Sequence, residues 1–424
     1  MTIFTYKFRL KDVTEIQVGF PFKSAEYSET GIKLLRGDNI GQGFLQWNGV
    51  KFWPIEKSSQ LSQYILQKDD VVIAMDRPWV SSGLKYSVIH QEDDGSLLVQ
   101  RVARLRSLPG IHKYILPYII GSGNFTNYIL SVQTGTTIPH ISLDQIGDYE
   151  FFAPPIKEQE KIGSLLRRLD NKIDLNRRTN ETLEAMARAL FRDWFVDFGP
   201  TRAKMAGEAP YLAPELWELF PDRLDDEGKP EGWINSLVGK QFDVTMGQSP
   251  PGNTYNSDGA GIPFYQGKTD FGFIFPQRRM YCTAPTRFAN ALDSLVSVRA
   301  PVGDVNFSEE KCCIGRGLAS VRHPHNLPYY TYFTMKFLRN VFSSFENTGT
   351  VFGSINKKQF EDLFVIESGL EKAFESQVMP TCSKIIANEA ESRTLTQLRD
   401  LLLPKLMSGE ISIRDAEKMV EDAA

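Results

Sequence analysis

Two parts of the chain carry glycine-bearing loops with amide, hydroxyl and basic side chains. Arg and Lys can pair with guanine edges in the major groove of DNA, Asn and Gln can pair with adenine edges, and glycine amides can approach phosphate closely. One such residue is usually a solvated loop residue, but the pattern recurs in both parts and therefore predicts a nucleic-acid contact. The candidates are Arg36, Asn39, Arg77, Gln133, Thr134 and Thr136 in the first part, and Gln248, Gln266, Lys268, Arg278, Arg299, Asn347, Thr348 and Thr350 in the second.

Two stretches imitate catalytic motifs without meeting their requirements. Residues 261–269 look like a phosphate-binding loop, but the two glycines are separated by five residues where the motif has four, and Pro263 removes an amide. Residues 221–229 carry the residue types of an acidic nuclease triad, but their spacing is too short for two strands. We expect no catalytic residue in this chain.

The four cysteines and the histidines do not form a recognisable metal site. Cys312, Cys313, His323 and His325 are zinc-type ligands, but they lack the usual ligand spacing. Scattered cysteines without a C-x-x-C pair favour buried, neutral thiols in a reducing cytoplasm. No run approaches about 18 apolar residues, so a membrane span is not expected. We predict a cytoplasmic protein that binds no metal.

The net charge of −4 is unevenly distributed along the chain. Residues 1–155 hold fifteen basic and fifteen acidic side chains, and residues 231–370 hold thirteen and twelve. The acidic excess lies in residues 201–230 and 371–424. Charge alone therefore neither favours nor excludes a nucleic-acid partner.

Residues 1–155 and 231–370 follow the same plan. A Thr-Gly-Thr motif occurs in both, and each copy precedes a short apolar run and a long helical pattern. Their separation far exceeds the roughly 20–50 residues of a solenoid unit, which indicates a domain duplication. Three further pairs of segments match in the same order, namely 34–40 with 264–270, 69–75 with 292–298 and 102–106 with 318–322.

Two long helices are predicted, within residues 156–198 and 371–424. Apolar residues recur at spacings of three and four, which is a heptad seam, and Asn176 and Asn180 interrupt it. Pro154-Pro155 and Gly199-Pro200 bracket the first helix. The seam consists of Ile162, Leu166, Leu169, Ile173, Leu183 and Leu190 in the first helix and Ile385, Leu395, Leu402 and Leu406 in the second.

Each helix could pack on its own module, or the two could pack against each other. A narrow apolar seam needs a partner helix of similar length, so we favour an antiparallel coiled coil. The expected fold is α+β, with two homologous α/β domains in a pseudo-twofold arrangement, separated by the two helices. An acidic connector, residues 199–230, joins the first helix to the second domain.

Specific segments resemble a known family, the specificity (S) subunit of type I restriction–modification systems. They are residues 152–162 at the entry to the central helix, 190–198 at its end, 230–233 at the start of the second domain, and 403–411 near the C-terminus. The match extends over nearly the whole chain. It departs at residues 367–371, where the Pro-Pro-x-x-Glu-Gln entry of the first helix has no counterpart.

The resemblance implies a non-catalytic DNA reader. Each of two target recognition domains would read half of an asymmetric, interrupted site, and the helices would fix the spacing. Two methyltransferase (M) subunits would bring S-adenosylmethionine and methylate adenine, and restriction (R) subunits would cut with ATP and Mg. These cofactors would bind the partner subunits.

Two other functions are weighed against this one. The first is a two-module coiled-coil scaffold that does not bind DNA, which salt-dependent DNA affinity would exclude. The second is a free-standing enzyme, which the missing motifs disfavour.

Overall fold

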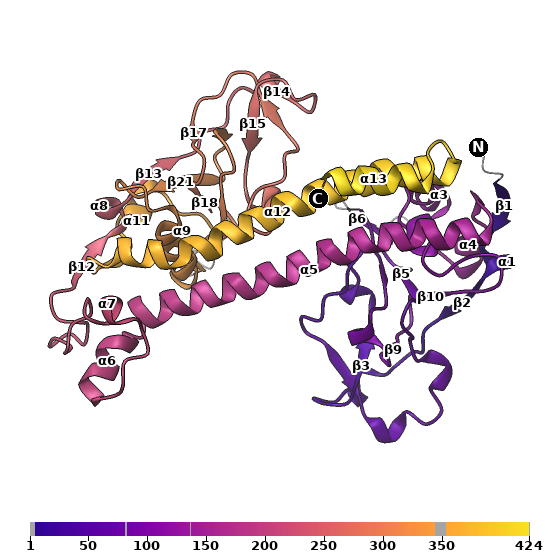
Figure 1. Ribbon diagram of the computed structural model, residues 1–424, viewed down its shortest axis with the longest axis horizontal. Coiled ribbons are helices and arrows are strands. Elements are labelled where there is room, and N and C mark those ends of the chain that lie inside the picture. Colours follow the sequence, from indigo (N-terminus) through magenta and orange to yellow (C-terminus); the bar gives the residue numbers. More distant parts are fainter. Residues whose placement is uncertain (1–4, 81–82, 136, 344–352, 424) are drawn as a thin grey trace. The chain divides into compact units, whose positions relative to one another are not determined.

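The computed structural model describes residues 5–80, 83–135, 137–343 and 353–423. The chain divides into unit 1, Met1–Leu175 with Glu391–Ala424, and unit 2, Asn176–Ala390. It leaves unit 1 in helix α5 (Ile156–Phe195) and returns in helix α12 (Glu371–Ser408), so each unit holds part of both helices (Figure 1).

Unit 1 is built on an antiparallel four-stranded sheet of order β2-β10-β5-β8. The central strand β5 is apolar along its whole length because both faces of the sheet are covered. Val71 and Ile73 face one core, and Val72 and Ala74 face another. The sheet strands are β2 (Thr14–Val18), β5 (Val71–Ala74), β8 (Tyr86–Val88) and β10 (Val102–Ser107).

Unit 2 repeats this sheet in the order β13-β21-β18-β19. Each unit also has an antiparallel pair, β1-β11 or β12-β22, and one parallel pair, β3-β9 or β15-β20. The same connectivity in both units confirms the duplication predicted from the sequence. The sheet strands are β13 (Asp243–Met246), β18 (Ser294–Ser297), β19 (Val305–Phe307) and β21 (Leu318–Arg322).

The remaining elements are short. In unit 1 they are β1 (Tyr6–Arg9), α1 (Leu10–Val13), β3 (Ile32–Leu35), β4 (Lys51–Trp53), β6 (Trp79–Val80), β7 (Gly83–Leu84), β9 (Leu97–Leu98), α2 (Leu116–Ile120), α3 (Gly123–Val132), α4 (Leu143–Gly147) and β11 (Glu150–Ala153). In unit 2 they are β12 (Ile234–Leu237), α8 (Val238–Gln241), β14 (Tyr255–Asn256), β15 (Ile262–Tyr265), β16 (Tyr281–Cys282), β17 (Phe288–Ala289), β20 (Cys312–Ile314), α9 (Pro328–Phe337), α10 (Arg339–Ser343), α11 (Lys357–Glu361) and β22 (Phe364–Glu367).

An ion pair with a buried carboxylate recurs at the same place in both sheets. Arg106 contacts both carboxylate oxygens of Asp70 at 2.7 Å, and the Nε of Arg322 lies 2.6 Å from Asp293. Each carboxylate also accepts a 2.7 Å hydrogen bond from the backbone amide three residues before it. Because a buried carboxylate is costly without partners, this arrangement stabilises the same turn twice.

Near the start of each long helix, one side chain accepts hydrogen bonds from backbone amides of the same unit. Gln159 of α5 is buried and accepts a 2.8 Å hydrogen bond from the amide of His112. In α12, Glu375 accepts bonds from the amides of Tyr329 and Tyr330, at 3.2 and 2.7 Å. In α12, which lacks the Pro-Pro-x-x-Glu-Gln segment, Glu375 therefore accepts the backbone hydrogen bonds in the way that Gln159 does in α5.

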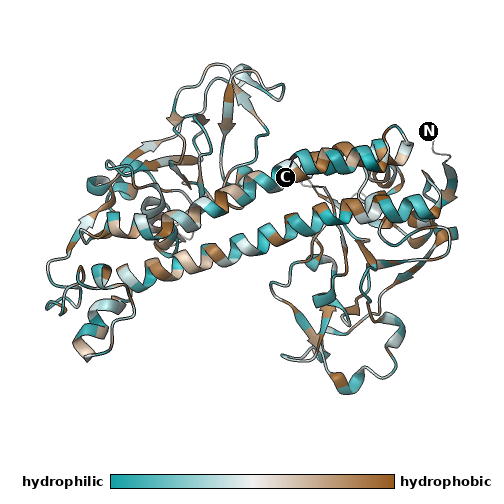
Figure 2. Ribbon diagram, viewed as in Figure 1, coloured by the Kyte–Doolittle hydropathy of each residue, from teal (hydrophilic) through white to brown (hydrophobic). Residues whose placement is uncertain are grey.

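Helices α5 and α12 pack antiparallel, which confirms the predicted coiled coil. In unit 1, Asp170 pairs with Arg399 at 2.7 Å and Lys172 with Glu391 at 3.2 Å, so the partner number falls as the α5 number rises. Apolar and polar residues alternate along both helices (Figure 2). Ile162, Leu166, Leu169, Ile385, Leu395, Leu402 and Leu406 are buried, while Ile173, Leu183 and Leu190 are partly buried.

Asparagines form a hydrogen-bonded cluster in the unit 2 part of the pair. Asn388 donates from Nδ2 to Asn180 Oδ1 at 2.8 Å, and Asn180 donates to Glu389 Oε1 at 3.0 Å. Asn176 donates to the carbonyl of Asn388 at 3.4 Å. All three asparagines are buried. Polar residues inside an apolar seam favour one register of the two helices.

The acidic connector is folded rather than extended. It contains α6 (Gly199–Ala206) and α7 (Pro214–Trp217), and Phe220 packs edge-on against Trp194 of α5 with ring centroids 5.0 Å apart. A last helix, α13 (Ile413–Ala423), packs through Ala416 onto the unit 1 core. Among the described helices, none has the length and apolar character that a membrane span requires.

Candidate nucleic-acid interface

The strand β3 and its counterpart β15 end in the same kind of loop. These turn loops, residues 36–46 and 266–277, each fold back through one isolated bridge, Ile40 to Leu45 and Phe271 to Pro276. The amide of Arg36 donates to Asn39 at 3.1 Å, and the amide of Gln266 donates to Asp270 at 2.7 Å. Asn39 and Asp270 therefore occupy equivalent positions at the start of each loop.

Asn39 has a structural role, which argues against the DNA contact predicted for it. Its side chain is 1% exposed, and its Nδ2 donates to the carbonyl of Gln46 at 3.0 Å while its Oδ1 accepts from Arg36. An amide engaged at both ends within its own loop is not available to a base. Arg36 is half-buried and Gln266 is exposed, so both remain candidates.

The Thr-Gly-Thr loop of unit 1 folds back on itself. Thr134 and His140 exchange backbone hydrogen bonds of 2.9 and 2.7 Å. Gly135 between them has φ +89°, and a Cβ there would lie 2.5 Å from the carbonyl oxygen of Ile138. Only glycine fits this position without strain. The closed loop keeps Thr134 exposed and Gln133 half-buried.

This loop is joined to the end of strand β5 by an ionic cluster. His140 Nδ1 lies 2.6 Å from Asp76 Oδ1, and Arg101 lies 2.5 Å from Asp76 Oδ2. Burial disfavours ionisation of Asp76, but its hydrogen bonds with His140 and Arg101 outweigh burial and hold its pKa below the usual value. The amide of Arg77 donates to the Thr-Gly-Thr loop at 2.7 Å. Arg77, Gln133 and Thr134 are therefore brought to one edge of unit 1.

Unit 2 has the corresponding junction at the end of β18. Arg299 forms an isolated antiparallel β-bridge with Ser354, and the amide of Ala300 donates to the carbonyl of Gly353 at 2.9 Å. The Arg299 side chain is exposed there. Four sequence candidates lie outside the described residues, namely Thr136, Asn347, Thr348 and Thr350.

The other unit 2 candidates are distributed over the module. Lys268 lies in the turn loop, 2.5 Å from Asp304. Arg278 is exposed and contacts two glutamates, Glu309 and Glu310, at 2.9 and 2.8 Å. Gln248 is exposed beside β20. The structure therefore groups Lys268 with Gln266 in one loop, and places Arg278 and Gln248 elsewhere.

An acidic and a basic residue exchange places between the two units. Lys85 and Asp304 are equivalent, since their carbonyls accept from the amides of Ala74 and Ser297 at 3.1 and 2.9 Å. In the sequence match of residues 34–40 with 264–270, Asp38 of the first turn loop corresponds to Lys268 of the second. Burial lowers the pKa of Lys85, and Asp38 opposes this shift by its negative charge. The acidic residue lies in the turn loop in unit 1, as Asp38, and beside the sheet in unit 2, as Asp304.

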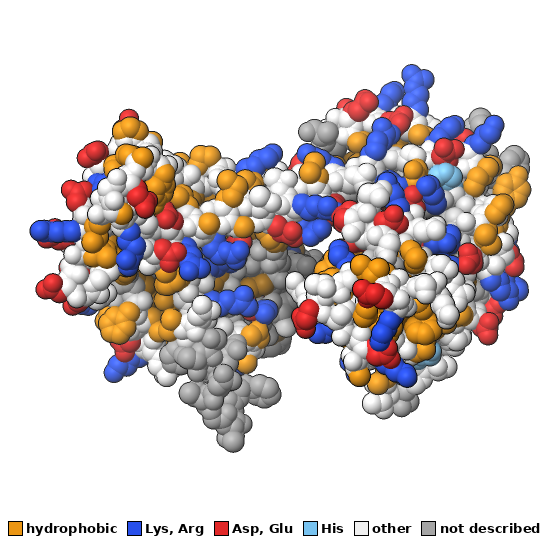
Figure 3. All heavy atoms as spheres, turned by 90° about the horizontal axis from the view of Figure 1, so that it is seen from below, with side chains coloured by type: hydrophobic (Ala, Val, Ile, Leu, Met, Phe, Trp, Pro, Cys, Tyr) orange, Lys and Arg blue, Asp and Glu red, His pale blue; other side chains and the backbone are white. Residues whose placement is uncertain are grey.

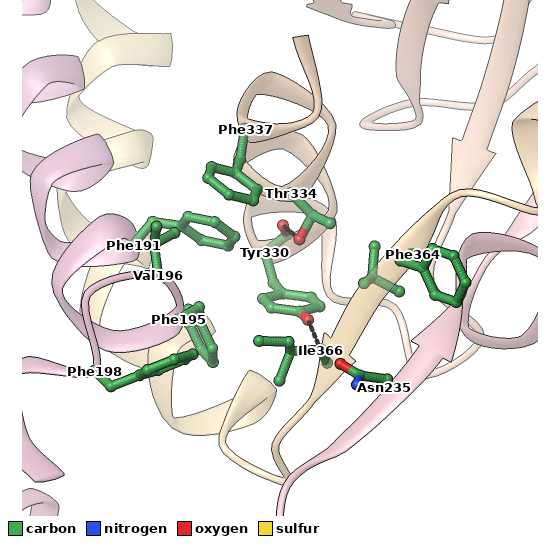
Figure 4. Close-up of a pocket in the computed structure, with 11 residues that line it drawn as sticks. Phe191, Phe195, Val196, Phe198, Asn235, Tyr330, Thr334, Phe337, Phe364 and Ile366 are labelled. Carbon is green, nitrogen blue, oxygen red and sulfur yellow. Dashed lines mark hydrogen bonds between the residues drawn. The ribbon is translucent and has the colours of Figure 1, made fainter. Parts of the chain in front are cut away.

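A separate apolar cavity lies in unit 2 where α5 ends. It has a volume of ≈ 200 Å³, and aromatic side chains from α5 and α9 face one another across it (Figure 4). The hydroxyl of Tyr330 donates to the carbonyl of Ile366 at 3.4 Å, and burial raises its pKa above the usual value. The lining residues include no Asp, Glu, His, Lys or Arg side chain.

Comparison with known proteins finds a family to which part of the chain is similar. Residues 5–185 match the model described as the type I restriction modification DNA specificity domain. A putative type I restriction enzyme MjaX specificity subunit from Methanocaldococcus jannaschii is 30% identical over 282 residues, which cover 65% of this chain and 62% of that protein. Over these residues the chain is similar to the type I specificity subunits. The alignments span less than two thirds of the first two relatives, with 42% of the second, the MjaVIII specificity subunit of the same organism.

Other type I specificity subunits are also similar to this chain. The EcoAI specificity subunit of Escherichia coli is 34% identical over 164 residues, covering 38% of this chain and 27% of that subunit. The crystal structure of a type I restriction–modification S subunit from M. genitalium superposes with a TM-score of 0.56 at 15% identity, with 96% of both chains covered. At that identity the likeness shows the fold alone.

Several polar residues of the candidate interface could not be predicted from the sequence. His140 and Asp76 hold the Thr-Gly-Thr loop, and Arg339 contacts the same carboxylate as Lys268, at 2.9 Å. Only His140 had a local signal, because it follows that motif closely. The others depend on contacts between distant segments.

Proposed function

We propose that this chain reads DNA sequence for a type I restriction–modification system. In this proposal each unit recognises one half of a bipartite, asymmetric site, and the chain directs adenine methylation and restriction by partner M and R subunits. The observation that carries the proposal is the duplication. The same sheet, turn loop and strand-end junction occur twice, with different exposed side chains on the two copies.

The helices suit the proposed role of a spacer. A regular helix pair with a defined register has a fixed length, and rigid connections make half-site spacing a geometric quantity. The asparagine cluster supports this role because it favours a single register.

The proposal assigns the chemistry to the partners. S-adenosylmethionine would bind the two methyltransferase subunits, and ATP and Mg would serve the restriction subunits. This chain would contribute recognition and no catalytic group. Its side chains form hydrogen bonds and charge contacts of the kind that position and read a duplex.

The test is to co-express the chain with its neighbouring methyltransferase and map methylated adenines across the genome. We expect one bipartite motif with a constant spacer, and loss of all its methylation when this chain is omitted. Methylation without a bipartite motif would refute the proposal.

A coiled-coil scaffold without DNA contacts is the competing function. A duplex carrying the mapped motif should bind the complex with an affinity that falls steeply as salt rises, because phosphate contacts release counterions. Binding that is absent, or independent of salt, would favour the scaffold.

A further inference from the structure

A basic cavity lies in unit 2 beside the turn loop. It has a volume of ≈ 290 Å³, and four cationic side chains line it from four different elements. Lys268 comes from the turn loop, Arg188 from α5, Lys336 from α9 and Arg339 from α10. Lys and Arg side chains are seen on this unit in Figure 3.

Two carboxylates pair with these cations, and one of them, Asp304, also lines the cavity. Asp304 contacts Lys268 at 2.5 Å and Arg339 at 2.9 Å, and its side chain is 14% exposed. Glu184 contacts Lys336 at 3.0 Å and Arg188 at 3.8 Å, and its side chain is 11% exposed. The arginines at the rim are each 62% exposed. Buried acids thus hold exposed bases in place.

This arrangement leaves an excess of positive charge at the rim. Four cations against two carboxylates give a net charge of +2, and the negative members lie deeper than the arginines. The backbone amides of Gly272 and Gly303 are already bonded to carbonyls, at 3.1 and 2.8 Å. An incoming anion would therefore be bound by the side chains, which are already oriented by their acids.

We infer that this cavity binds one backbone phosphodiester of the DNA duplex. The inference rests on the proposed function and adds to it a fixed anchor point for the second half-site. A phosphodiester has one negative charge and several acceptor oxygens, and arginine and lysine are its usual partners. A phosphate contact positions the duplex and carries no base information, so the anchor would not change the sequence that is read.

The test uses the complex with the methyltransferase and a labelled duplex bearing the mapped motif. Arg339→Gln removes a rim cation while Lys268 still pairs with Asp304, so the fold should be kept. We expect the slope of log affinity against log salt to become less negative by about 0.9. As salt rises from about 50 to 200 mM, the wild type should lose about 3.5-fold more affinity than the variant.

Matched variants and substituted duplexes complete the experiment. Arg339→Lys retains the charge and should retain the slope, and Arg223→Gln, at an exposed arginine of the connector, should behave as wild type. A scan of single methylphosphonates should find one position that weakens the wild type and leaves Arg339→Gln unaffected. The methylated motif should be the same in all variants.

Two outcomes separate this inference from the proposed function. If the wild type binds the motif but Arg339→Gln and Lys268→Gln keep its salt slope, the phosphate site is refuted and the reading function stands. If the wild type does not bind the motif at all, both are refuted. A cavity that takes free phosphate instead would show stabilisation by inorganic phosphate with an unchanged DNA slope, which also overturns the inference.

Discussion

Replacing Asn180 by alanine should destabilise the helix pair of unit 2. Asn180 and Asn388 are 0% and 2% exposed, and the substitution removes the acceptor of the 2.8 Å bond from Asn388. It also removes the 3.0 Å bond to Glu389. A buried donor left without a partner costs about 1–3 kcal/mol. We expect a loss of about 2–3 kcal/mol in the local free energy of opening.

The double variant Asn180→Leu/Asn388→Leu provides the counter-test. Replacing both members of a buried hydrogen bond by apolar residues of similar size is nearly neutral or stabilising. We therefore expect it to recover most of the stability lost by Asn180→Ala, at the expense of a less specific register.

Native-state hydrogen exchange of α12 amides measures this effect region by region, which suits a chain with more than one folding unit. Asn171→Ala, at an exposed asparagine on α5, is the matched control for helix propensity. If Asn180→Ala slowed or preserved exchange around Ile385–Glu389, or if the double variant were worse than the single one, the reasoning would be wrong.

Three further outcomes are expected. Inserting one heptad into each of α5 and α12 lengthens the helix pair by about 10.5 Å. The mapped spacer should therefore grow by about three base pairs at 3.4 Å each, while both half-sites stay unchanged. A changed half-site would contradict the division into spacer and readers. Arg322→Leu removes the 2.6 Å contact with Asp293, while the carboxylate keeps its bonds from Asn290 and Ser320. The loss should be about 1–3 kcal/mol in urea unfolding, and an unchanged free energy of unfolding would contradict the role of the ion pair. Burial raises the pKa of Cys312 from its ordinary value of 9.0 to about 12. The contribution of this thiol to stability is therefore intact below pH 9 and is lost as pH rises toward 12. Mass spectrometry should find Cys312 unmodified by iodoacetamide in the native protein at pH 8 and modified in urea, and rapid modification of the native protein would contradict this.

The regular parts of the fold could be predicted because their signals are local and repeated. The seam from Ile162 to Leu190 has helical spacing throughout, and the structure forms one helix of 40 residues there. The matched segments around Asp70 and Asp293 likewise share their order, and the structure gives them the same ion pair. Periodicity and order along the chain are properties that a sequence displays directly.

The individual side-chain roles could not be predicted in the same way. Asn39 has the residue type of a base reader, but the fold directs its amide into its own loop. Lys268 faces a carboxylate from a hairpin more than thirty residues away. Such partners are chosen by tertiary contacts, which composition and spacing do not encode. The connector was predicted as an acidic linker by its composition, yet Phe220 packs it against α5.

The exchanged charges at Asp38–Lys85 and Lys268–Asp304 restrict how copies of this module could be recombined. A crossover between the turn loop and the following sheet would place Asp38 beside Asp304, or Lys268 beside Lys85. Either hybrid would bring like charges together at a partly buried position, whereas each parental module is matched. Exchanges that preserve folding should therefore transfer the turn loop and the sheet as one block, with their boundaries in the long helices.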